Sequence, residues 1–103
     1  MLQLFSHDTI TFVLQPKKND KEYKLSNEES ISLVILNKGR KNTYFATYNS
    51  EEASCPTIKI DASNFCGKCY YYFCYTNSAT GEEYLLSQIS PVIFLRSVTK
   101  LNG

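Results

Sequence analysis

The chain has 103 residues, of which 11 are basic and 10 acidic, so its net charge is +1. This length fits one domain spanning 1–103 with a single core, and scattered basic residues exclude the electrostatic footprint of a nucleic-acid-binding protein. No apolar stretch reaches the ~18 residues of a membrane span, and the N-terminus lacks the features of a signal peptide, so we expect a protein without membrane segments that is made in a cytosol.

Apolar and polar residues alternate along most of the chain, which is typical of half-buried β-strands. The first strand is predicted at 8–15, where Ile10, Phe12 and Leu14 share one face before Pro16 ends the hydrogen-bonded ladder. A short extended piece follows around Tyr23 and Leu25. Further strands are predicted at 30–37, 43–48, 56–61 (with Ile58 and Ile60 inward), 69–76, 82–87 and 91–97.

Polar segments rich in turn-forming residues separate these strands. Residues 17–21 are predicted to form a loop, 37–42 to close one hairpin and 77–81 to close another. Seven or eight short strands at a spacing of about ten residues leave no room for crossover helices, so they predict an antiparallel β-sandwich. The predicted fold class is all-β.

The segment from Phe65 to Leu86 is predicted to be the central hairpin, and its first strand carries no charge on either face. We expect Tyr71 and Phe73 to point into the core, on the face they share with Cys69 and Tyr75. The opposite face would carry charged or polar side chains in a monomer exposed to water. Instead it carries Tyr70, Tyr72 and Cys74, and the outward side of 30–37 adds two aliphatic residues. These faces predict a protein interface made of Val34, Leu36, Tyr70 and Tyr72.

The four cysteines raise the alternative of a zinc site. Cys66 and Cys69 have the spacing of a zinc knuckle, and Cys55 and Cys74 would complete four thiolates. However, a second pair with that spacing is missing, and Cys69 and Cys74 lie five residues apart on one strand, hence on opposite faces. We therefore expect Cys69 to be a core residue and Cys74 a residue of the sheet surface, with no metal required.

The sequence predicts no catalytic residues and no cofactor. His7 is the only histidine, no nucleophile motif surrounds it, and nothing brings it to a cysteine. Glu82 and Glu83 are adjacent in a strand, so they point to opposite faces and cannot act as a pair on one substrate. Since a glycine-rich phosphate-binding signature is also missing, we expect a protein that is not an enzyme.

One pattern runs through nearly the whole chain: Asp8-Thr9-Ile10-Thr11-Phe12, an apolar strand at 30–36, the segment 61–67, Cys69 with Tyr71 and Phe73, Gly81-Glu82-Glu83-Tyr84, and a last apolar strand at 91–95. This order resembles the small immunoglobulin-like β-sandwich domains of bacteriophage virion proteins, such as baseplate N-terminal domains and head-attached proteins. Cys69 stands where that loose pattern has a tyrosine.

The resemblance implies a structural role in a virion, with docking surfaces in place of an active site. A self-contained domain best suits a decoration protein on the capsid surface, with the major capsid protein or another virion protein as its partner. A tail or baseplate adaptor is the second expectation, and a zinc-stabilised host-interaction domain the third. The expected location is the virion, after synthesis in the host cytoplasm.

Overall fold

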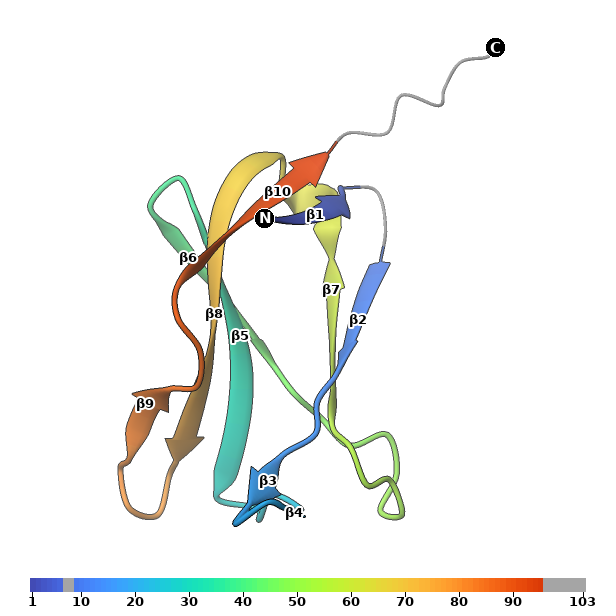
Figure 1. Cartoon of the computed structure of the whole chain (residues 1–103), viewed down its shortest axis with the longest axis vertical. Coiled ribbons are helices and arrows are strands. Elements are labelled where there is room, and N and C mark those ends of the chain that lie inside the picture. The colour runs from blue at the N-terminus through green and yellow to red at the C-terminus, as the bar shows by residue number, and fades with distance from the viewer. Residues whose placement is uncertain (7–8, 96–103) are drawn as a thin grey trace.

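The computed structural model describes residues 1–6 and 9–95. Apart from one short 3₁₀ turn, the regular elements of these residues are all β-strands, which confirms the all-β prediction (Figure 1). The elements are β1 (Leu2–Phe5), β2 (Thr9–Val13), β3 (Lys17–Lys18), β4 (Lys21–Glu22), β5 (Glu29–Asn37), β6 (Arg40–Phe45), β7 (Thr57–Asp61), the 3₁₀ turn η1 (Ala62–Asn64), β8 (Gly67–Asn77), β9 (Glu83–Leu85) and β10 (Ser90–Leu95).

The larger sheet, sheet A, is organised around β8, as the uncharged central hairpin predicted. Its strand order is β1-β10-β8-β5-β6, and β9 also pairs with β8. One edge of β8 pairs with β5 over most of its length. The other edge pairs first with β10 and then with β9. Because β8 has neighbours on both edges, it is an inner strand of the sheet. Its side chains alternate between the two faces of the sheet.

The prediction of a purely antiparallel fold is wrong at the N-terminus, because β1 runs parallel to β10. Leu2 and Leu4 pack against the core, and this burial fixes a strand whose partner lies at the other end of the chain. The predicted loop at 17–21 is also different, since its ends pair as the short ribbon β3–β4. Asn19 and Asp20 both have positive φ values at this tip, a conformation that these residues tolerate in tight turns.

A second sheet, sheet B, contains β2 and β7 and packs on one face of sheet A (Figure 1). Ile58 and Ile60 of β7 are fully buried, as predicted, and lie opposite Phe12 and Ile10 in the register of the pair. The core between the two sheets holds the side chains of Leu33, Ile35, Ile58, Ile60, Ala62, Phe65, Cys69, Val92 and Phe94. Two facing β layers around one core form a sandwich-like arrangement.

Both hairpins were predicted, but the first turn is shorter than the predicted 37–42 and its second strand lies at Arg40–Phe45 instead of 43–48. Lys38 and Gly39 have φ values of 52° and 82°, the positive pair that a two-residue turn needs to match the twist of β5 and β6. At the end of β8, the Asn77 carboxamide oxygen accepts hydrogen bonds from the amides of Ala79 and Thr80, at 2.9 and 3.3 Å. This side chain closes the turn that leads to β9.

The inward assignment of Tyr71 and Phe73 is confirmed, since both pack against the core cluster. Cys69 is buried beside them, whereas Cys74 lies on the other face of β8 opposite Ser32. The expectations for His7, for Asp8 at the start of the first strand, and for Arg96 and Ser97 at the end of the last one lie outside the described residues.

Candidate functional site

The four predicted interface residues come together on the face of sheet A that points away from sheet B. Val34 lies opposite Tyr72, and Leu36 lies opposite Tyr70, in consecutive outward positions of the β5–β8 pair. The cross-strand register thus places the four side chains in two adjacent rows. The register places all four residues on one face of sheet A, and their role as a protein interface stays a prediction.

Three further apolar or polar residues extend this surface, and the sequence interpretation missed them. Phe45 lies opposite Ser32, Thr43 opposite Val34, and Leu85 opposite Cys74. Only the strand register shows which residues of β6 and β9 adjoin the predicted pairs. We call this surface the outer face; it comprises Ser32, Val34, Leu36, Lys41, Thr43, Phe45, Tyr70, Tyr72, Cys74 and Leu85.

The outer face contains both buried and exposed side chains. Val34 is only 3% exposed, so its side chain is covered by its neighbours and supports the surface from below. Phe45, Leu85 and Tyr70 are 59%, 52% and 42% exposed. A shallow depression of about 300 Å³ lies between β6 and β9, with Lys41 and Glu83 as the charged residues among those that line it. The other residues that line it are uncharged, and few charged residues are typical of the core of a protein interface.

The thiols do not assemble into a metal site in the described part of the chain, where no three cysteine, histidine or acidic side chains cluster. Cys69 is buried inside the sandwich, and Cys74 lies on the outer face. Burial raises the pKa of both thiols, so they are poorer nucleophiles than exposed cysteines. Glu82 and Glu83 are both exposed; Glu82 precedes β9 and Glu83 is its first residue.

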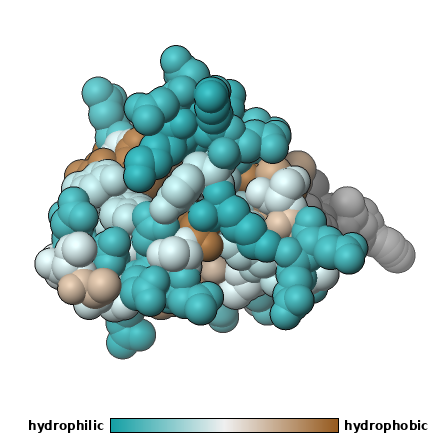
Figure 2. Space-filling model, turned by 90° about the horizontal axis from the view of Figure 1, so that it is seen from below, coloured by the Kyte–Doolittle hydropathy of each residue, from teal (hydrophilic) through white to brown (hydrophobic). Residues whose placement is uncertain are grey.

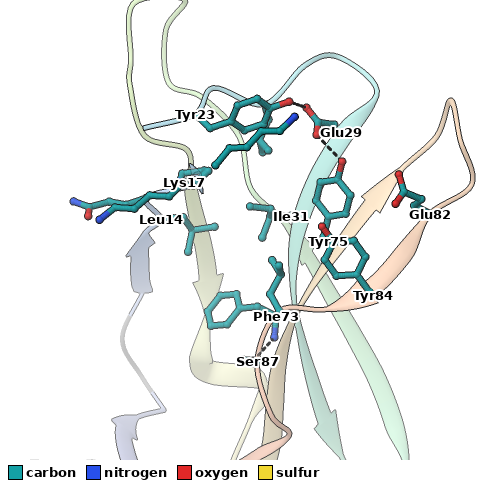
Figure 3. A pocket seen from close by; sticks show the side chains of 15 residues that line it. Leu14, Lys17, Tyr23, Glu29, Ile31, Phe73, Tyr75, Glu82, Tyr84 and Ser87 are labelled. Carbon is teal, nitrogen blue, oxygen red and sulfur yellow. Dashed lines mark hydrogen bonds between the residues drawn. The ribbon is translucent and has the colours of Figure 1, made fainter. Parts of the chain in front are cut away.

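A second feature, which the sequence did not indicate, is a carboxylate held by two tyrosines at the β3–β4 end of the sandwich. The hydroxyl groups of Tyr23 and Tyr75 each donate to the Glu29 carboxylate at 2.5 Å (Figure 3). The amide of Ser26 also donates to it, at 2.9 Å. Hydrogen bonds to the charged form lower the pKa of Glu29 to about 2 and raise the pKa of Tyr23 to about 12. Glu29 therefore joins β5, β8 and the segment after β4 as an anion.

We expect Glu29 to make the stability of the protein depend on acidity. Its pKa falls from an ordinary 4.5 to about 2 on folding, so its contribution is fully present above pH 4.5 and is lost as the pH falls toward 2. Glu29→Gln should lower the urea midpoint of unfolding at neutral pH. The difference in midpoint between the variant and the wild type should become smaller as the pH falls from 4.5 toward 2. Parallel losses of stability in both proteins across the range would contradict this role for Glu29.

The described residues contain no helix long and apolar enough to cross a membrane. No protein-family description matches the chain, and no curated protein shows significant sequence similarity to it.

Proposed function

We propose that this chain is a non-enzymatic structural protein of a bacteriophage virion, of the immunoglobulin-like sandwich type, and that it binds the capsid surface through its outer face. The observation that carries the proposal is the outer face itself, on which the side chains of Phe45, Leu85 and Tyr70 are exposed. Exposed aromatic side chains on a sheet are the kind of groups that stable protein contacts use. The resemblance of the sequence to virion sandwich domains supports the choice of a capsid as partner.

The two faces of sheet A differ in what covers them. Sheet B covers the inner side of β5 and β8, whereas among the described strands none packs over their outer side. An apolar surface on a soluble protein is stabilised when a partner removes it from water. The major capsid protein is the partner that this proposal assigns to the outer face.

We expect Phe45→Ala and Tyr70→Ala each to weaken attachment to particles by about 1–3 kcal/mol, because interface energy concentrates in a few aromatic side chains. Val13→Ala is the matched control, since Val13 is 64% exposed but belongs to sheet B. Particles assembled with each variant are separated on a density gradient, and the bound chain is quantified against the major capsid protein.

The wild-type chain and Val13→Ala should sediment with filled heads, and the two outer-face variants should be depleted from them. Sedimentation with isolated tails would replace the capsid assignment by a tail or baseplate adaptor. A wild-type chain that stays in the unassembled fraction would overturn the virion proposal. Melting temperatures of all variants, measured in parallel, separate lost contacts from lost folding.

A further inference from the structure

The cavity beside Glu29 has an apolar floor and lies on the opposite side of sheet A from the outer face. Its volume is about 550 Å³, and Leu14, Ile31 and Phe73 contribute to its lining. Figure 3 shows Leu14 and Ile31 pointing toward one another across it, with Phe73 beyond them. At this end of the molecule, hydrophilic side chains surround a small hydrophobic area (Figure 2). Such a floor accommodates the aliphatic part of a ligand.

The Glu29 carboxylate gives this cavity a negative charge. It accepts hydrogen bonds from Tyr23, Ser26 and Tyr75, all of them neutral groups. Among the described residues no lysine or arginine forms an ion pair with Glu29. The site therefore holds a fixed negative charge that is hydrogen-bonded but not neutralised, and a cationic donor would neutralise it.

Aromatic rings line the cavity next to this carboxylate. Tyr75 and Tyr84 are stacked with ring centroids 4.8 Å apart and planes inclined at 30°. The Tyr23 ring already carries a cation on its face, since the Lys18 ammonium lies 5.3 Å from its centroid. Aromatic faces attract cations, and a planar guanidinium also stacks on them, which a compact ammonium cannot do.

From this combination we infer that the cavity binds the guanidinium group of an arginine side chain supplied by a partner protein. The arginine stem lies on the apolar floor, and its head donates to Glu29 beside the Tyr75–Tyr84 pair. Glu82 also lines the cavity and adds to the attraction, whereas Lys17 and Lys18 oppose it. Removing Lys18 should therefore tighten binding, an effect that a purely structural role of the cavity would not produce.

The test is a nuclear magnetic resonance titration of the full chain with N-acetylarginine N-methylamide, a blocked arginine that mimics a side chain in a protein. The citrulline derivative is the matched probe, because it has the same shape without the charge. We expect the arginine probe to shift the ring resonances of Tyr75 and Tyr84 with millimolar affinity, and the citrulline probe to bind at least about tenfold more weakly.

Variants assign the binding to this cavity. Glu29→Gln should weaken the arginine probe about tenfold, and Tyr84→Leu severalfold, because they remove the charge and the stacking surface respectively. Tyr84 is 51% exposed, so its replacement tests the site even where Glu29→Gln fails to fold. Lys18→Ala should bind severalfold more tightly. Tyr70→Ala, which alters only the outer face, should leave the titration unchanged, so this test is independent of the capsid proposal.

Equal binding of the arginine and citrulline probes, or weaker binding after Lys18→Ala, would overturn the guanidinium site. The guanidinium site would also be overturned if the arginine probe, up to its solubility limit, shifted no resonance of a residue that lines the cavity. Free arginine that binds more tightly than the blocked derivative would identify a small-molecule site and overturn the assignment to a protein partner.

Discussion

Phe94→Ala is expected to lower the free energy of unfolding by about 3–5 kcal/mol, a large fraction of the stability of a domain of this size. Phe94 is 2% exposed and stacks on Phe65 with ring centroids 5.0 Å apart. The two rings join β10 to the segment that leads into β8. Truncation of Phe94 leaves a cavity that neighbouring side chains cannot fill without moving.

Phe45→Ala is the matched control for this substitution, because Phe45 is 59% exposed on the outer face. It removes the same side-chain atoms from a site without core packing, so stability should change by no more than about 0.5 kcal/mol. Urea unfolding followed by circular dichroism measures both variants. Comparable losses of stability in the two proteins would contradict the assignment of Phe94 to the core and Phe45 to a free surface.

Phe73→Ala is expected to cost about 3 kcal/mol, the lower end of the range for a truncated phenylalanine, because Phe73 is only partly buried. Its ring meets those of Phe12 and Tyr71 edge-on, at centroid distances of 6.2 and 6.3 Å. The contact with Phe12 connects β8 to sheet B. Loss of this side chain therefore weakens the packing of one sheet on the other.

The substitution Tyr72→Ala, at the residue next to Phe73, tests which side chains of β8 point into the core. Tyr72 points to the outer face opposite Val34, so its removal should cost about 1 kcal/mol and leave the core packed. The ratio of the two losses in urea unfolding is the measurement. If Tyr72→Ala proved the more destabilising of the two, the inner and outer faces of β8 would be interchanged.

The strands that alternation predicts well are those with one covered face. In β2 and β7, inward Phe12 and Ile58 alternate with outward residues, and the structure keeps this pattern. β1 was missed because it is short and its pairing with β10 joins segments from opposite ends of the chain. A local pattern carries no information about so distant a partner.

The two candidate sites differ in how far the sequence could predict them. Alternation along the two strands indicates that Val34, Leu36, Tyr70 and Tyr72 point outward, but the pairing of β5 with β8 that sets Val34 opposite Tyr72 and Leu36 opposite Tyr70 was not predicted. The Glu29 site joins residues 46 positions apart. Only the register of β5 with β8 brings Tyr75 to that carboxylate, and hydrophobic periodicity cannot indicate such a contact.

The native cysteines allow the most direct measurement of whether the outer face is the docking surface. Cys74 lies within the outer face, and Cys55 precedes β7 of sheet B. Maleimide labelling of the free chain and of purified particles, read by mass spectrometry, compares both thiols, and Thr43→Cys supplies an exposed outer-face probe. Docking through the outer face predicts that particles protect Cys74 and the introduced Cys at 43 severalfold, while Cys55 reacts at its free rate. Unchanged labelling of the two outer-face thiols, with protection of Cys55, would contradict it.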